Sequence, residues 1–240
     1  MLNKVIILAG GLGTRLSEET STRPKPMVEI AGIPLLLHIM RIFQAQINCE
    51  FLVATGYKSE MISKYLGGKE FSREQIKARA IYTGDDTATA GRIKKIMEFY
   101  PNEPFLMTYG DGVANINLCS LLEFHKKHKK VATVTAVRPA ARYGRLEISQ
   151  GLVTSFAEKP QAEEGWINGG FFVLEPEVKD YIDGPMEMFE QEPMSRITAK
   201  SQLMGFKHYG FWQPMDTLRE KIELEKLASL GKVPWMVFDL

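Results

Sequence analysis

The sequence has few cysteines, almost no net charge and no long apolar run, and each absence excludes a class of protein. Its two cysteines, Cys49 and Cys119, lie far apart without metal-binding spacing, which predicts buried small residues in a reducing compartment rather than a disulfide framework. A net charge of +1 gives no overall field that favours nucleic acid or a membrane surface. No stretch is long enough to span a bilayer, and the first apolar run is too short for a signal peptide, so we expect a cytoplasmic protein.

The patterns of nucleophilic enzymes are also missing. The four histidines have neither metal-binding nor proton-relay spacing, and no serine–histidine–aspartate pattern or thiol nucleophile is indicated. His38 stands within an apolar helical run and is expected to be a packed structural residue. Length and apolar content are ordinary, because 240 residues with 45% hydrophobic content can form one large unit with a real core.

Strand and helix patterns alternate through the first half of the chain. The strand runs cover 5–8, 51–55, a strand around 81, 105–109 and 131–137. The helical runs between them cover 35–43, 60–66, 93–97 and 118–128. This α/β alternation predicts a Rossmann-like, doubly wound, mixed but mainly parallel sheet with helices on both faces. Ligands of such sheets bind beyond the carboxyl ends of the strands.

The second half has a different pattern. We expect a small β-hairpin elaboration at 146–156 and an apolar strand at 171–174. Helices are then expected at 177–182, 194–200 and 217–230, with an aromatic loop at 209–212 before the last of them. No repeat, low-complexity tract or linker interrupts the chain, so we expect a single domain over residues 1–240.

A glycine-rich stretch, LAGGLGTRLSEETSTRPKP over residues 8–26, follows the first strand. Three glycines bare the backbone N–H groups, which can then approach an anion closely, and Arg15 and Lys25 add positive charge. This layout predicts a phosphate cradle. It is neither a Rossmann fingerprint, because Leu16 stands where the third glycine belongs, nor a P-loop. From these residues alone, a plain glycine turn with two solvated cations remains open.

The full run LAGGLGTRLSEET, followed by RPKPMVEI, resembles the signature of sugar-nucleotidyltransferases, the pyrophosphorylases that join a nucleoside triphosphate to a sugar 1-phosphate. The INGGFF and FWQPMDTLR runs share this resemblance, which extends from Val5 to the VPWMVF run. It implies a fold like that of nucleotide-diphospho-sugar transferases. The SEET variant resembles the members that transfer CMP from CTP to glucose 1-phosphate, releasing pyrophosphate, in cell-surface polysaccharide biosynthesis. The resemblance to these members implies that the substrates are small molecules and that the protein forms a homo-oligomer.

The resemblance also implies roles for individual residues. It implies a nucleotide-binding half at 1–137 and an acceptor-binding half at 138–240. Arg15, Lys25 and Asp111 are implied to be catalytic. The residues implied to bind the nucleotide are Leu8, Ala9, Gly10, Gly11, Leu12, Gly13, Thr14, Arg15, Lys25, Thr87, Arg92, Gly110 and Asp111. Thr87 could instead cap a helix that begins at Ala88.

Only the resemblance assigns two aspartates, which lie about a hundred residues apart in the sequence, to one site. Asp111 in YGDGVA and Asp216 in FWQPMDTLR match the two family positions that hold Mg²⁺, a cation that takes one or two carboxylates plus substrate oxygens. Taken alone, Asp111 is a turn residue after a strand, and Asp216 is a helix N-cap.

The acceptor is implied to be held by two short motifs. In AEKP, Lys159 would neutralise the acceptor phosphate and Glu158 would accept sugar hydroxyls, whereas alone they are an exposed charged pair. In WINGG, Asn168 and Gly169 would recognise the sugar, whereas alone they are an Asn-Gly turn.

Three departures from the family pattern leave alternatives open. Segment 57–83 is shorter than usual, Leu37 replaces a tryptophan, and Ala90 replaces a glycine. The acceptor could therefore be another sugar phosphate, or a non-sugar phosphate such as a phosphorylated amino-acid derivative. A different class of function, a non-catalytic regulatory subunit that binds nucleotide and sugar phosphate, is also open.

Overall fold

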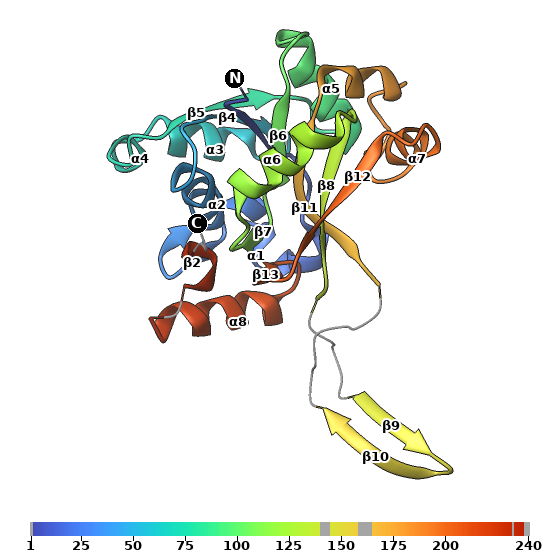
Figure 1. Cartoon of the computed structure of the whole chain (residues 1–240). Helices are drawn as coiled ribbons and strands as arrows, with labels where there is room; N and C mark the ends of the chain where they lie inside the picture. Colours follow the sequence, from blue (N-terminus) through green and yellow to red (C-terminus); the bar gives the residue numbers. More distant parts are fainter. Residues whose placement is uncertain (1, 140–144, 158–164, 232, 238–240) are drawn as a thin grey trace.

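The structure is a computed structural model that describes residues 2–139, 145–157, 165–231 and 233–237. Its centre is a seven-stranded sheet with the strand order β12-β8-β11-β6-β1-β4-β5 (Figure 1). The strands are β1 (Lys4–Ala9), β4 (Glu50–Thr55), β5 (Lys77–Tyr82), β6 (Phe105–Tyr109), β8 (Ala132–Val137), β11 (Ile167–Leu174) and β12 (Leu203–His208). Both halves of the chain therefore contribute strands to the same sheet.

The sheet is mixed and mainly parallel, which confirms the predicted fold class. β1 pairs in parallel with both β4 and β6, β4 with β5, and β8 with β12. Only β11 runs antiparallel, to β6 on one side and β8 on the other. The chain moves outward from β1 through β4 and β5, then returns to place β6 on the other side of β1. Such a reversal opens a crevice at the carboxyl ends of β1 and β6.

Helical segments cover both faces of the sheet because its central strands are apolar on both sides. In β1, Val5 and Ile7 belong to one core cluster while Ile6 and Leu8 belong to the other, as the two-residue period of a strand requires. The first cluster is covered by α2 (Leu35–Gln44), α3 (Ser59–Leu66), α6 (Leu118–His128) and α8 (Leu218–Ser229). The second is covered by α5 (Thr89–Phe99), η3 (Pro176–Tyr181) and α7 (Glu192–Ala199).

A short ladder brings the end of the chain to the carboxyl edge of β6. β7 (Gly112–Ala114) pairs antiparallel with β13 (Trp212–Pro214), and the amide of Met215 donates to the carbonyl of Asp111 at 2.7 Å. β13 begins within the segment expected to be an aromatic loop. The ladder places the residues that follow Tyr109 beside those that precede α8.

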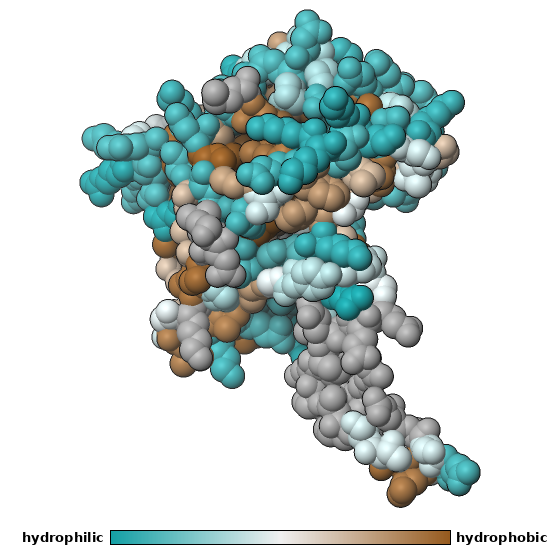
Figure 2. Space-filling view, viewed as in Figure 1, coloured by the Kyte–Doolittle hydropathy of each residue, from teal (hydrophilic) through white to brown (hydrophobic). Residues whose placement is uncertain are grey.

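The predicted hairpin is present as β9 (Arg145–Ser149) and β10 (Leu152–Ala157), and Figure 1 shows it projecting from the body. Figure 2 shows brown, hydrophobic atoms at its tip, where Leu152 and Val153 are exposed. The remaining short elements are η1 (Thr14–Leu16), α1 (Ser17–Thr20), η2 (Lys25–Met27), β2 (Glu29–Ile30), β3 (Ile33–Pro34), α4 (Lys69–Ser72) and η4 (Pro234–Met236).

One expectation from the sequence is wrong, and one strand was missed. The helix expected at 177–182 is present as the 3₁₀ helix η3 over Pro176–Tyr181. β12 was not expected, since this edge strand has an irregular exposure pattern with Gly205 inside it. Cys49 is buried as expected, but Cys119 is exposed on α6. Among the described residues, no helix is both long and apolar enough to cross a membrane.

Candidate active site

The glycine-rich loop leaves the end of β1 and turns at Gly13. Gly13 has φ = 66°, a left-handed conformation that favours glycine, and its carbonyl accepts the amide of Leu16 at 3.0 Å. Within the described parts of the chain, the amides of Gly11, Leu12 and Gly13 donate to no acceptor. Successive unpaired N–H groups at the end of a central strand form a concavity suited to an anion.

Arg92 on α5 ties this loop to two neighbouring strand ends. Its buried guanidinium donates to the carbonyls of Gly10, Thr55, Gly84 and Asp85 and to the hydroxyl of Thr83, at 2.6 to 3.3 Å. A Cβ at Gly10 would stand 2.2 Å from the Arg92 Nη1 atom, so any other residue there would displace the guanidinium. Burial lowers the pKa of Arg92. Because its N–H groups already serve protein oxygens, the nucleotide contact implied for Arg92 stays a prediction.

Two cations and two carboxylates meet beside the loop, and we call them the carboxylate cluster: Arg15, Lys25, Asp111 and Asp216. The Lys25 ammonium donates to Asp111 Oδ2 at 2.9 Å and to Asp216 Oδ1 at 2.5 Å. The Arg15 Nη1 atom donates to Asp216 Oδ2 at 2.7 Å. The Lys25 side chain is 11% exposed, whereas that of Arg15 is 73% exposed. The structure therefore brings together four charged residues to which the resemblance gives roles at the nucleotide and the metal.

Asp216 is not the N-cap of the last helix, although its position in the sequence, taken alone, predicts that role. The cap of α8 is Thr217, whose hydroxyl accepts the amide of Glu220 while the Glu220 carboxylate accepts the amide of Thr217, forming a capping box. The Asp216 side chain is thus left to face Lys25. The β7–β13 ladder supplies the proximity to Asp111 that no sequence spacing indicates.

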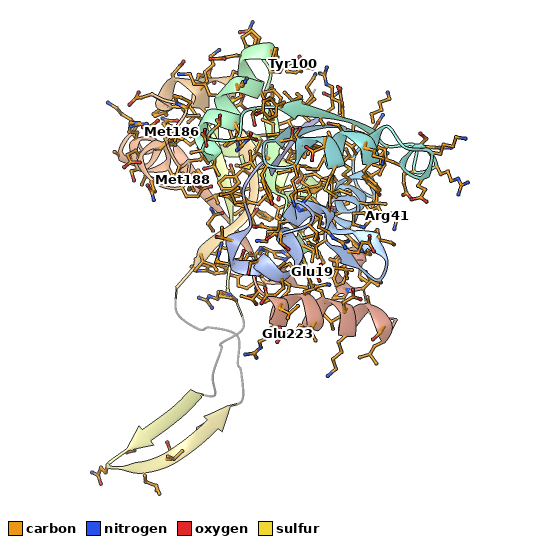
Figure 3. The ribbon with its side chains drawn as sticks, turned by 180° about the vertical axis from the view of Figure 1, so that it is seen from behind. Glu19, Arg41, Tyr100, Met186, Met188 and Glu223 are labelled. Atoms are coloured by element: carbon orange, nitrogen blue, oxygen red, sulfur yellow. The ribbon has the colours of Figure 1, made fainter. Side chains whose placement is uncertain are left out.

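A cleft of about 490 Å³ opens over the loop. Every residue predicted to bind the nucleotide lines it, from Leu8 through Arg15 together with Lys25, Thr87, Arg92, Gly110 and Asp111. Thr87 does not cap α5, since Ala88 occupies that position and the Thr87 hydroxyl donates to the carbonyl of Thr83. Tyr109 and Met188 also line the cleft, although sequence reasoning missed them. Figure 3 shows Met188 beside Met186 on the segment before α7.

Of the residues predicted to bind the acceptor, the structure describes Asn168 and Gly169, which lie next to the cleft. The Asn168 amide nitrogen donates to the Tyr109 hydroxyl at 3.1 Å, and the Gly169 carbonyl accepts the Trp212 indole N–H at 2.8 Å. Tyr109 immediately precedes Gly110 and Asp111 on the cleft wall. Glu158 and Lys159 lie outside the described residues.

An ion pair fixes the far side of the loop. Glu19 on α1 pairs with Lys221 on α8, and Figure 3 shows Glu19 above that helix. The Tyr57 hydroxyl donates to the carbonyl of Thr20 at 3.2 Å. The segment that contains α1 is therefore held both by the residues after β4 and by α8.

Comparison with known proteins identifies the family. The sequence model described as Nucleotidyl transferase matches residues 4–213. The chain belongs to the nucleotidyltransferase family. This confirms the family indicated by the glycine-rich run.

Relatives in the nucleotidyltransferase family cover the whole chain. It is 44% identical to the glucose-1-phosphate cytidylyltransferase of Salmonella typhi, over 98% of this chain and 100% of the relative. It is 39% identical to a probable glucose-1-phosphate cytidylyltransferase of Bacillus subtilis, with the same coverage. A putative glucose-1-phosphate thymidylyltransferase from Bacillus anthracis has a similar fold, with a TM-score of 0.76 at 18% identity over 94% of each chain.

Proposed function

We propose that the protein transfers CMP from CTP to α-D-glucose 1-phosphate, giving CDP-glucose and pyrophosphate. The observation that carries this proposal is the carboxylate cluster at one edge of the nucleotide-sized cleft. The choice of cytosine and glucose rests on the full-length relatives named glucose-1-phosphate cytidylyltransferase.

The reaction is a direct displacement in which charge repulsion is the main obstacle. A phosphate oxygen of the acceptor attacks the α-phosphorus of CTP, the bond from that phosphorus to the bridging oxygen breaks, and pyrophosphate leaves. The attacking oxygen is already anionic, so no general base is needed. Two unit charges at about 4 Å repel by roughly 1 kcal/mol in water and about 4 kcal/mol at an effective dielectric of 20. Neutralisation and alignment therefore dominate catalysis.

Each residue of the site has a place in this reaction. The amides of the glycine-rich loop bind phosphate oxygens, and Arg15 and Lys25 offset the charge of the triphosphate. Asn168, Gly169 and Glu158 bind the sugar of the acceptor. Lys159 binds the acceptor phosphate. The first half of the chain, 1–137, then serves mainly the nucleotide, and the second half, 138–240, the acceptor.

Asp111 and Asp216 fit a magnesium ion. Both carboxylates reach one ammonium group, so they are near enough for one small cation to contact both. Among the described residues, no group of three or more histidine, cysteine or acidic side chains could hold a metal, which leaves the other ligands to phosphate oxygens and water. When bound, Mg²⁺ would supply further neutralisation of the triphosphate.

The decisive experiment is a matrix of the four nucleoside triphosphates against sugar and non-sugar phosphates, with magnesium, read by pyrophosphate release and by the mass of the product. We expect CTP with glucose 1-phosphate to give the fastest release and a product with the mass of CDP-glucose. Faster release with another acceptor would establish the alternative substrate. No release with any pair would favour the non-catalytic binding subunit and overturn the proposal.

A further inference from the structure

Glu190 joins three elements that surround the cleft. It lies on the segment between η3 and α7, and its Oε1 atom accepts the Tyr109 hydroxyl of β6 at 2.6 Å. Its Oε2 atom accepts the hydroxyl of Thr89, the first residue of α5, at 2.8 Å. The segment itself is held against α5, because the Pro185 carbonyl accepts the Ala88 amide at 2.9 Å.

The hydrogen bonds around Glu190 have only one consistent direction. The Thr89 hydroxyl accepts the amide of Phe189 at 2.7 Å, so its own proton points to Glu190. A carboxylate only accepts, and the single proton of Tyr109 therefore also points to Glu190. The oxygen of Tyr109 is then left as an acceptor, and the Asn168 amide nitrogen donates to it.

This direction fixes the orientation of the Asn168 side chain. Its nitrogen must face Tyr109, and its oxygen accepts the amide of Gly170 at 2.9 Å. Asn168 is exposed, so one N–H and one oxygen lone pair remain for a ligand. An amide held in one orientation offers a donor and an acceptor in a set order, which distinguishes the hydroxyl pattern of one sugar from another.

The tyrosine ring is itself held in place. Gly170 of β11 has φ = 85°, and a Cβ there would stand 2.7 Å from the Tyr109 ring. The absence of a side chain at Gly170 therefore leaves room for this ring. The ring also packs edge-to-face on Phe172 with centroids 6.1 Å apart. A phenol keeps its proton at neutral pH, so the hydroxyl remains a donor.

We propose that Glu190 is a positioning residue that acts through Tyr109 to fix the Asn168 amide and thereby the choice of acceptor. This inference rests on the proposed function, in which Asn168 contacts the acceptor. Glu190 touches neither reacting group. Its contact with Thr89 at the same time ties the acceptor side to the wall of the nucleotide cleft.

Replacing the carboxylate by an amide of equal size breaks this order. In Glu190→Gln, one oxygen can accept from only one neighbour, and the nitrogen donates to the other. If Thr89 receives that proton, the Thr89 hydroxyl proton loses its acceptor, and Tyr109 donates to a neutral amide oxygen, which holds the phenol proton less firmly than a carboxylate does. If Tyr109 receives it, its own proton turns toward Asn168. The Asn168 amide must then flip, which brings its N–H groups against the Gly170 amide, and two donors repel.

The test compares Glu190→Gln, Tyr109→Phe and the double variant with the wild type. Glu192→Gln is the matched control, since Glu192 is exposed two residues further on. We expect Glu190→Gln to raise the KM for glucose 1-phosphate about tenfold, as the loss of one such hydrogen bond implies, with the KM for CTP nearly unchanged. The preference for glucose 1-phosphate over galactose 1-phosphate should fall with it. Glu190→Gln should add nothing in the Tyr109→Phe background, because Glu190 acts through Tyr109.

A second measurement does not depend on turnover. The ¹⁵N side-chain amide resonance of Asn168, identified by its loss in Asn168→Asp, should shift in Glu190→Gln and stay in place in Glu192→Gln. An unmoved resonance, an equal rise in both KM values, or an undiminished effect in the Tyr109→Phe background overturns the inference. An inactive wild type would instead overturn the proposed function, and the resonance still decides whether Glu190 positions Asn168.

Discussion

Two polar clusters stand at opposite edges of the sheet, and they are built in opposite ways. The carboxylate cluster lies where β1 and β6 end. The other, which we call the histidine chain, consists of His125, His128, Thr133 and Glu175. β11 runs antiparallel to β6, so Glu175, just beyond the end of β11, lies at the edge where β6 begins.

The hydrogen bonds of the histidine chain run in one direction. The Lys130 amide donates to His128 Nδ1 at 2.9 Å, so the proton of this ring is on Nε2, which faces the Thr133 hydroxyl at 2.7 Å. Thr133 then donates to His125 Nδ1 at 2.7 Å, and His125 Nε2 donates to Glu175 at 3.0 Å. Each group has its partner within the protein.

The carboxylate cluster differs because its partners can be exchanged. Asp111 lines the cleft, and the side chains of Asp111 and Asp216 are 35% and 23% exposed, so a ligand can replace one protein contact by another. Saturation by fixed partners within the protein therefore marks a structural cluster, whereas charges that share partners at a cleft mark a candidate binding site. Four variants test this distinction.

Lys25→Ala is expected to have the largest effect. It removes the cation shared by Asp111 and Asp216 and should lower turnover about 10²- to 10³-fold, the loss typical of one charge-stabilising donor. Pyrophosphate release measures it, and circular dichroism should show a folded chain because water reaches both carboxylates. Arg23→Ala, which removes a half-buried cation outside the carboxylate cluster on the same segment, is the control. Nearly normal turnover would remove Lys25 from the site.

Arg92→Ala sharpens the comparison, because Arg92 lies at the cleft but is saturated like the histidine chain. Its loss leaves the carbonyls of Gly84 and Asp85 without a donor among the described residues and removes one of the hydrogen bonds to those of Gly10 and Thr55. We therefore expect the free energy of unfolding to fall by about 3 kcal/mol. Urea denaturation measures this, with exposed Arg73→Ala as the control. An unchanged midpoint would mean that Arg92 does not hold the loop.

Asp216→Asn tests whether the carboxylate cluster exchanges its partners. Under the proposed role, the Mg²⁺ concentration for half-maximal activity should rise about ten- to a hundredfold. Titration of activity with magnesium measures it, and Asp180→Asn, at an exposed position, is the matched control. The same magnesium requirement in both variants would exclude Asp216 as a metal ligand.

The histidine chain should affect stability rather than turnover, with the smallest effect. Burial, followed by the charges of His125 and Lys130, lowers the pKa of His128 below 6.5 in the folded state. The unfolded chain therefore binds the proton more readily, and this stability, present above pH 6.5, is lost as the pH falls through the folded pKa. Urea denaturation from pH 7.5 to 5 should show a shallower decline in His128→Gln than in wild type or exposed Lys127→Gln. Equal slopes would contradict the assignment.

Local patterns were sufficient for most of the fold. Strand and helix runs such as 105–109 and 118–128 are confirmed because their apolar residues recur with the period of their own element. The edge strand β12 was missed because pairing with β8, rather than its own pattern, makes it a strand. Residues such as Tyr109 and Glu190 gave no signal, since each matters only through contacts with distant segments.

The sequence by itself determined the family, the alternation that builds the sheet, and the glycine-rich loop with Arg15 and Lys25, because these depend on neighbours along the chain. Only the tertiary structure decided that Asp111 and Asp216 share one ammonium group and that Arg92 is committed to the loop. The reason is physical: the β7–β13 ladder joins residues a hundred positions apart, and whether a charge is free or saturated depends on every segment that packs around it.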